Sequence, residues 1–296
     1  MSFPQDKLGI NFENVPLHID WNRWTGVENP PHSPSKVDYS AGVLSQEQVL
    51  SPDFHYWISQ LRLPLLINRK YWEYFVLLHQ SFLAGLFERS SSHVIGFGVG
   101  NEPIPAYFAS QKVRVTATDY IEGPSAEAWS GTNELLNFEK LIRPDICSTA
   151  MFNSFITVQS VDMNNIPIQF HNKYDLCYSL CSLGHIGGFS YSRQFILESL
   201  NVLKPGGVAI HTFEMDLDNG ERYEHPDHTI FLKADVISII AEVKSMGFKV
   251  ERHALEQGNG YLENYLDQYP FGSSPHLFLD LNGHRSLPTV LVIKKP

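Results

Sequence analysis

The sequence predicts an α/β protein with a doubly wound, mostly parallel sheet of seven strands that ends in an antiparallel edge pair. Three observations predict this fold. Buried or β-branched runs alternate with segments of helical spacing from His93 onward. Glycines and prolines separate these segments. No helical pattern stands between the last two runs, 249–255 and 288–295, so we expect these two strands to pair antiparallel.

Each expected element follows from its own pattern. Apolar residues at helical spacing, without an internal proline, predict a helix over 64–89. Pro205, Gly206 and Gly207 end another helix, and Gly247 ends a third. The expected strands are 93–100, 113–119, 155–162, 173–182, 208–214, 249–255 and 288–295, and the remaining helices are 105–110, 193–207 and 233–248.

The first 55 residues differ from the rest of the chain. Prolines at positions 30, 31 and 34 forbid a continuous helix there. Trp21, Trp24 and Tyr39 are nevertheless too apolar for a simple linker. We therefore expect an irregular N-terminal arm over 1–55 that packs on the main body and serves as a lid or acceptor wall, and one main domain over 56–296.

Composition limits the class of protein. The 296 residues are 43% hydrophobic and 18% charged, which is typical of a globular chain. No apolar run reaches the ~18 residues of a membrane span, and the first residues lack the pattern of a secretory signal. The three cysteines make an odd number without framework spacing, which fits a reducing compartment. We expect a cytoplasmic protein.

The charge balance bears on partners. The formal net charge is −10, and no block of Lys and Arg interrupts it. A protein that binds a phosphate backbone normally carries a basic stripe, so this balance argues against nucleic acid as the main partner. The sequence leaves a homo-oligomer open.

Three glycines at alternate positions, Gly96, Gly98 and Gly100, follow the first expected strand. They allow the backbone to pass close to a ligand, and ligands of doubly wound sheets bind outside the carboxyl ends of the strands. Asp119 ends the next strand about 20 residues later, where a carboxylate accepts hydrogen bonds from a ribose. A dinucleotide motif would have a further glycine where Asn101 stands. Alone, this pattern suits NAD, FAD or S-adenosylmethionine.

Three later features complete the pattern. "SVDMNNIP" places Asp162 and Met163 after the third strand, "YDLCYSLCSLGHIG" combines the fourth strand with a loop that carries His185, and "LNVLKPGGVAIHTFE" is a helix, a turn and the fifth strand. In this order they resemble the class I S-adenosylmethionine-dependent methyltransferases, over roughly residues 70 to 296. The resemblance implies a Rossmann-like methyltransferase fold and S-adenosyl-L-methionine as cofactor. It implies that Asp119 binds the ribose and that Asp162 and Met163 meet the adenine.

The sequence departs from the family pattern at two points. Members usually carry an acid two residues before the first glycine, where this chain has Val94. Glu102, just beyond the turn, or Glu73, in the preceding helix, is expected to meet the cationic end of the cofactor instead. The stretch between Asp119 and Asp162 is also long and resembles an inserted cover element, with Trp129 as a candidate wall of the site.

His185 is the expected general base. In the resembling fold the loop after the fourth strand borders the transferring methyl group, and an imidazole that titrates near neutrality suits removal of a hydroxyl proton. His211 and Glu214, at the end of the fifth strand, are expected to face the same pocket mouth and are the alternatives. Asp216 and Asp218 follow closely, but without a tight carboxylate cluster we expect no metal.

The expected acceptor is a small molecule or a sugar. Aromatic residues are candidates to line its pocket: Tyr71, Trp72, Trp129, Tyr178 and Tyr191. "RKYWEY" before the glycines and "HTFE" after Lys-Pro-Gly-Gly resemble methyltransferases of bacterial glycan and polysaccharide assembly. The sequence therefore predicts an O-methyltransferase. A catalytically silent cofactor-binding protein and a nicotinamide-dependent oxidoreductase remain the alternatives.

Overall fold

The computed structural model describes residues 30–40, 42–121, 136–217, 220–225, 227–251, 254–272, 274–281 and 283–296. Trp129, Asp218 and the arm before residue 30 lie outside these ranges. In the part of the chain that is described, no helix is both long and apolar enough to cross a membrane.

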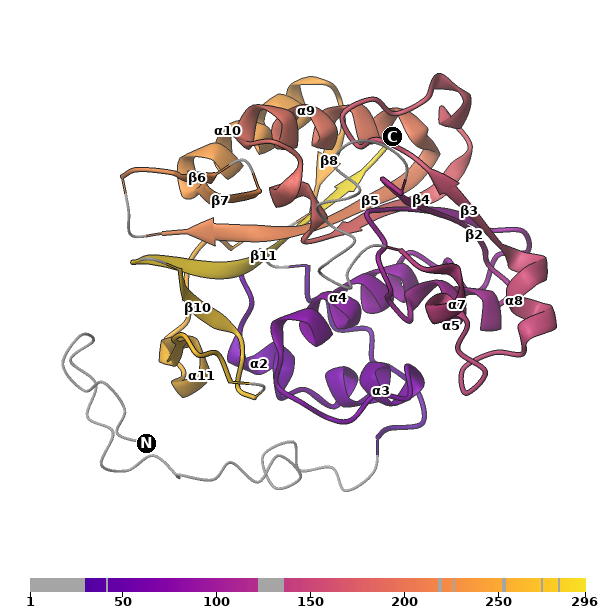
Figure 1. The fold of residues 1–296 in the computed structure, drawn as a ribbon, viewed down its shortest axis with the longest axis horizontal. Helices are drawn as coiled ribbons and strands as arrows, with labels where there is room; N and C mark the ends of the chain where they lie inside the picture. Colours follow the sequence, from indigo (N-terminus) through magenta and orange to yellow (C-terminus); the bar gives the residue numbers. More distant parts are fainter. Residues whose placement is uncertain are drawn as a thin grey trace.

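A twisted sheet forms the centre of the molecule (Figure 1). Strand β1 pairs in parallel with β2 on one side and β4 on the other, β3 extends the sheet beyond β2, and β5 extends it beyond β4. Strand β11 then pairs antiparallel with β5. The order β3-β2-β1-β4-β5-β11 confirms the predicted mostly parallel sheet and reverses direction between β1 and β4, the topological switch point. The bounds are β1 (His93–Phe97), β2 (Arg114–Asp119), β3 (Ile156–Ser160), β4 (Tyr174–Leu180), β5 (Leu203–Asp216) and β11 (His284–Lys294).

The predicted count of seven strands is wrong, because the described residues form an 11-stranded sheet. The expected edge partner of β11 is β8 (Lys249–Val250), which pairs antiparallel with it as predicted. Strands of two to five residues are too short to show a clear alternation in sequence. The four strands that were not predicted are β6 (Tyr223–His225), β7 (His228–Leu232), β9 (Leu266–Asp267) and β10 (Phe278–Leu281).

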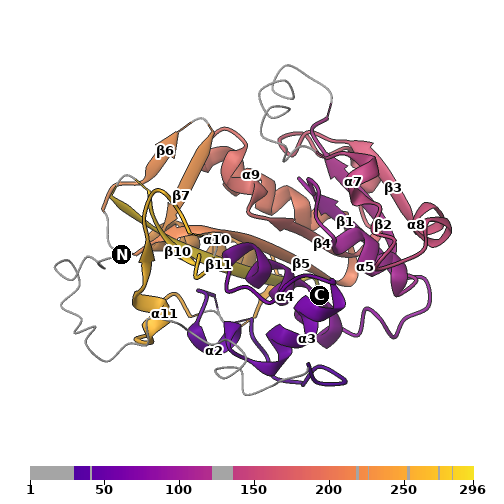
Figure 2. The ribbon, with the colours of Figure 1, turned by 60° about the horizontal axis from the view of Figure 1, so that its bottom comes forward.

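Helices cover both faces of the sheet (Figures 1 and 2). Helices α9 (Phe189–Ser199) and α10 (Lys233–Ser245) lie on one face, and α4 (Arg69–Leu83) and α5 (Ile104–Ser110) lie on the other. Helix α4 begins later than predicted, because the Asn68 side chain accepts from the Lys70 amide and caps it. The shorter helices are α2 (Gln46–Val49), α3 (Pro52–Gln60), α7 (Phe138–Leu141), α8 (Thr149–Phe155) and α11 (Tyr261–Asn264).

The described part of the N-terminal segment packs on the main body, and it contains helices α2 and α3 where we expected irregular chain. Tyr39, Val43, Leu44 and Phe54 are buried in the same core as the sheet, and Val43 bridges to Thr289 of β11. Helix α3 runs across the expected boundary between residues 55 and 56. Residues from 39 onward therefore contribute to the core of the main body, and the bounds of the arm and its role as a lid stay predictions.

Candidate functional site

The glycine turn follows β1 at the switch point. Gly98 and Gly100 have positive φ values of 61° and 55°, which glycine adopts without a Cβ clash. A Cβ on Gly98 would lie 2.5 Å from the Cβ of Ser182, so the loop after β4 packs directly on the turn. Gly96 has a different reason to be glycine, because a Cβ there would lie 2.6 Å from the buried Tyr178 hydroxyl.

Asp119 ends β2 beside this turn. Its Oδ2 accepts from the amides of Gly100 at 3.2 Å and Leu136 at 3.0 Å, and its Oδ1 accepts from the Tyr120 amide at 2.9 Å. Burial raises the pKa of Asp119 above its usual value, although these three amides act to lower it. A carboxylate offers about four lone-pair sites, so one site on Oδ1 remains after these three bonds.

The segment after β3 lies on the other side of the turn. Met163 is buried, and its sulfur lies 3.4 Å from the position that a Cβ on Gly98 would take. Asp162 accepts from the Asn164 amide at 2.8 Å, and the Asn164 side chain donates to the Ile186 carbonyl at 3.1 Å. The structure thus brings Met163 to the glycine turn and gives Asp162 the local role of a turn carboxylate.

Val94 has no carboxylate, and it is fully buried in β1, between β2 and β4. The carboxylates of Glu73 and Glu102 lie nearby instead, on either side of Lys70. The Lys70 Nζ is 3.0 Å from Glu73 Oε2 and 2.9 Å from Glu102 Oε1, and it also donates to the Leu180 carbonyl at 2.9 Å. Both acids that the sequence offers for the cationic end of a cofactor therefore meet at one lysine.

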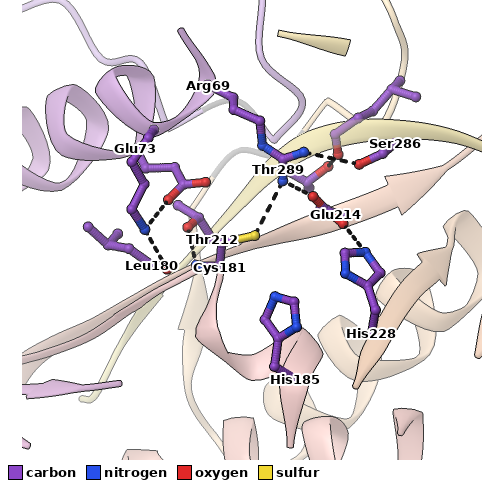
Figure 3. Close-up of polar contacts among 12 residues, drawn as sticks. Arg69, Glu73, Leu180, Cys181, His185, Thr212, Glu214, His228, Ser286 and Thr289 are labelled. Atoms are coloured by element: carbon purple, nitrogen blue, oxygen red, sulfur yellow. Dashed lines mark hydrogen bonds and ion pairs between the residues drawn. The ribbon is translucent and has the colours of Figure 1, made fainter. Parts of the chain in front are cut away.

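A second polar cluster lies at the carboxyl ends of β4 and β5 (Figure 3). Glu214, near the end of β5, is buried and forms an ion pair with Arg69 at the start of α4. Arg69 also donates to the Ser286 hydroxyl and the Cys181 sulfur, each at 3.4 Å. Because strand residues alternate between faces, Glu214 points to the α4 side, where Arg69 compensates its charge.

Strands β6 and β7 form a hairpin that adds His228 to this cluster. The His228 Nε2 contacts the Glu214 Oε2, on the side of the carboxylate that Arg69 leaves open (Figure 3). Burial, together with the charge of Arg69, lowers the pKa of His228 to about 4. The imidazole is therefore neutral near pH 7, and a carboxylate facing Nε2 requires the proton on that nitrogen.

His185 lies beside His228, with ring centroids 4.9 Å apart at 75°. Its Nδ1 is 2.5 Å from the carbonyl oxygen of Asp227, the residue just before His228. A carbonyl can only accept, so Nδ1 carries the proton and Nε2 carries the basic lone pair. Burial lowers the pKa of His185 to about 4, against the effect of the Asp227 carbonyl, so the imidazole is neutral at pH 7. This differs from the expectation that His185 titrates near neutrality.

The expectation that His211 faces the pocket mouth is wrong. His211 is fully buried on the α9 side of β5, against Phe195. Its ring nitrogens lie 2.8 Å from Ser179 Oγ and 3.0 Å from Ser199 Oγ. Ser199 already donates to the Ile196 carbonyl, so His211 donates to Ser199 and accepts from Ser179. His211 is a core residue with both ring nitrogens hydrogen-bonded, and it lies on the face of β5 opposite to Glu214.

The aromatic lining differs from the expectation as well. Trp72 is fully buried and donates to the Gln48 side chain at 2.8 Å, and Tyr178 is fully buried in the core. Tyr71 stacks on Tyr74, and Tyr191 is exposed on α9. Neither Trp72 nor Tyr178 can form an open pocket wall.

Asp216, at the end of β5, was considered as a metal ligand in the sequence. Asp216 is buried with its carboxylate 3.1 Å from the His284 Nδ1. Within the described ranges, no group of three His, Cys, Asp or Glu residues could hold a metal ion.

Sequence reasoning missed Arg69, Lys70, Ser182 and His228. Arg69 and Lys70 stand at the start of a helix that was predicted, but the pattern does not tell which sheet edge the helix start meets. His228 belongs to "ERYEHPDHTIFL", where a short turn between a polar run and an apolar run was the only local signal for a hairpin.

The chain matches no family model and no curated protein. Among solved structures, an S-adenosylmethionine-dependent methyltransferase from Methanosarcina mazei is 12% identical, with a TM-score of 0.42 over 70% of this chain and 93% of that one. The 1,6-didemethyltoxoflavin-N1-methyltransferase from Burkholderia thailandensis, solved with S-adenosylhomocysteine, is 14% identical, with a TM-score of 0.40 over 73% and 76%.

A third similar structure carries a different activity in its name. The [4+2]-cyclase SpnF is 16% identical, with a TM-score of 0.41 over 74% of this chain and 82% of that one. Similarities this distant do not identify a reaction, and a fold hosts many chemistries. The chemistry of this site therefore depends on the contacts of its own residues.

Proposed function

We propose that this protein binds S-adenosylmethionine at the carboxyl ends of β1 and β2 and transfers the methyl group to a hydroxyl of a small acceptor. The observation that carries the proposal is the meeting of two sets of groups at one sheet edge beside the switch point. Asp119 and Glu102 belong to the first set. His185, His228 and Glu214 belong to the second, at the ends of β4 and β5.

The groups at β1 and β2 fit the proposed cofactor. Glu102 Oε2 is buried and has no hydrogen-bond partner, so it is suited to accept from the ammonium of the methionine part. Asp119 Oδ1 has room for one ribose hydroxyl besides the Tyr120 amide. Met163, beside the glycine turn, offers an apolar surface to an adenine.

The groups at β4 and β5 suit the removal of a proton. The cofactor supplies a methyl group that its sulfonium charge has already activated. His185 Nε2 accepts the hydroxyl proton while the oxygen–carbon bond forms and the sulfur–carbon bond breaks. The Asp227 carbonyl keeps the proton of the neutral imidazole on Nδ1, which leaves Nε2 as the basic nitrogen. Among acceptors, the sequence resemblance favours a sugar.

A binding and turnover assay tests this function. Calorimetry with S-adenosylmethionine and, separately, NADH should show binding of the first alone. Asp119→Asn removes the charge but keeps the shape, and we expect it to weaken binding by about 10- to 150-fold, the equivalent of ~1.5–3 kcal/mol. Asp145→Asn, at an exposed ion pair with Arg143, is the matched control and should bind as the wild type does.

The outcomes separate the alternatives. Unchanged affinity in Asp119→Asn would remove the ribose assignment, and binding of NADH in place of S-adenosylmethionine would favour an oxidoreductase. Tight cofactor binding without turnover on a broad panel of hydroxylated acceptors would favour a catalytically silent binding protein.

A further inference from the structure

The ion cluster of Glu73, Lys70 and Glu102 has an unusual charge balance for a buried site. Both carboxylate side chains are at most 6% exposed, and Lys70 is the cation that both contact. The three protons of its ammonium go to Glu73, Glu102 and the Leu180 carbonyl, which uses its full donor capacity. With both acids ionised, the cluster keeps one net negative charge.

The remaining negative charge is concentrated on Glu102. Its Oε1 contacts Lys70, whereas its Oε2 is buried without a hydrogen-bond partner. The Tyr178 hydroxyl, on β4, is likewise buried and has no hydrogen-bond partner. Two unsatisfied polar atoms at the switch point are costly unless a ligand or water meets them.

The neighbouring cation does not neutralise this charge. Arg69, the residue before Lys70, forms its ion pair with Glu214, so those two charges cancel. Asp119, at the end of β2, adds a second negative charge that acts on Glu102. This edge of the sheet is therefore complementary to a ligand with a net positive charge.

We propose that the Glu73–Lys70–Glu102 cluster is a charge-selective subsite that favours S-adenosylmethionine over S-adenosylhomocysteine. The inference rests on the proposed function. S-adenosylmethionine carries one net positive charge, because its ammonium and sulfonium outweigh its carboxylate. The product has lost the sulfonium charge and is neutral overall. The subsite thus binds the methyl donor more tightly than the product that remains after methyl transfer.

The protonation of Glu102 makes the selectivity dependent on pH. Burial raises the pKa of Glu102 to about 7, although Lys70 acts to lower it. The carboxylates of Glu73 and Asp119 raise it further. The hydroxyls of Tyr74 and Tyr178 also face Glu102, and their pKa values are raised mainly by burial, so they stay neutral. Below the pKa of Glu102 the cluster is neutral, and above it the net negative charge returns.

Calorimetry with three ligands tests the subsite. S-adenosylmethionine and sinefungin carry a cation at or beside the sulfur position, and S-adenosylhomocysteine does not. One pH unit above the pKa of Glu102, we expect the wild type to bind both cationic ligands about tenfold more tightly than the product, and one unit below it the preference should shrink. Glu102→Gln should show almost no preference at either pH. Glu88→Gln, at an exposed position, is the control and should behave as the wild type does.

Each outcome has a separate meaning. If no ligand binds the wild type, the proposed function fails and the subsite fails with it. If all three ligands bind but Glu102→Gln keeps the wild-type preference, the subsite alone is overturned. A thermal melt of each variant shows whether it is folded, and Glu73→Gln, which also removes one charge from the cluster, replaces Glu102→Gln if that variant is not.

Discussion

At the scale of single residues, the environment separates three histidines that look alike in sequence. His185 and His228 lie ring to ring, and one nitrogen of each contacts an oxygen, from the Asp227 carbonyl and the Glu214 carboxylate respectively. His211 has both nitrogens bonded to serine hydroxyls inside the core. Hydrogen-bond partners, and not the distance from a strand end, thus decide which imidazole is placed to accept a substrate proton.

A pair of alanine variants tests this separation. His185→Ala should lower kcat by about 10²–10⁴, with cofactor affinity nearly unchanged, because the base is lost and the fold is kept. His211→Ala should instead lower the free energy of unfolding by about 2–4 kcal/mol, because it leaves a cavity and the Ser179 hydroxyl without a partner. Its kcat should stay within a few-fold of wild type. Turnover and urea unfolding measure the two effects, and the reverse pattern would move the base to the α9 face of β5.

At the scale of elements, the β6–β7 hairpin is the addition that completes the candidate catalytic cluster. It supplies the Asp227 carbonyl to His185 and the His228 ring to Glu214. Arg222, just before β6, anchors it through two hydrogen bonds to Asp235 of α10, at 2.9 and 2.6 Å, and its guanidinium lies 4.0 Å above the Phe189 ring.

Removal of the Arg222 side chain should therefore reduce turnover without a large change in cofactor affinity. We expect Arg222→Ala to lower kcat about tenfold, because a small displacement of reacting groups is costly, and to leave the affinity for S-adenosylmethionine within about twofold. Steady-state kinetics and calorimetry measure both. The matched control is Arg193→Ala, which breaks an ion pair between α9 and α10 that does not involve a residue of the hairpin. An equal loss of kcat in the control would mean that general loosening, and not the hairpin, is responsible.

At the scale of the whole molecule, the sequence predicts the repeating part of the fold well. The alternation in Arg114–Asp119 and the glycines that follow His93–Phe97 place β2, the turn and Asp119 correctly. The pairing order cannot be derived from such local patterns. Glu214 and His211 differ by an odd number of positions, so they point to opposite faces, but only the packing of α4 decides which face meets the cluster.

The parts that sequence reasoning missed have a common physical origin. Lys70 and Arg69 act on residues more than a hundred positions away, at Leu180 and Glu214. Such contacts arise from the way α4 crosses the sheet edge, and no spacing within the chain records them. The sequence therefore predicts functional residues that stand at the end of one strand. It does not predict contacts between two elements that are distant in the chain.

The pH dependence of stability is the last prediction at this scale. Burial lowers the pKa of His185 and His228 to about 4 and that of His211 to about 3, from 6.5. Between these values and 6.5 the unfolded chain binds protons that the folded chain does not. The free energy of unfolding therefore rises with pH there, by up to about 1.4 kcal/mol per pH unit for each histidine held neutral.

The raised pKa of Glu102 acts in the opposite direction. Between its ordinary pKa of 4.5 and about 7 the folded chain holds a proton that the unfolded chain has lost, so this group lowers stability as pH rises. The raised pKa of Asp119 acts in the same direction as that of Glu102, whereas burial also lowers the pKa of His79 and His93. The histidines with a lowered pKa therefore outnumber the two carboxyls with a raised one, which leaves a net rise. His211 is fully buried, so its contribution is the clearest. Urea unfolding at several acidic pH values measures this effect. The free energy of unfolding should rise less steeply with pH in His211→Ala than in the wild type, whereas His225→Ala, at an exposed position, should keep the wild-type slope. Parallel slopes for the wild type and His211→Ala would show that His211 binds its proton equally in the folded and the unfolded chain, which contradicts a lowered pKa.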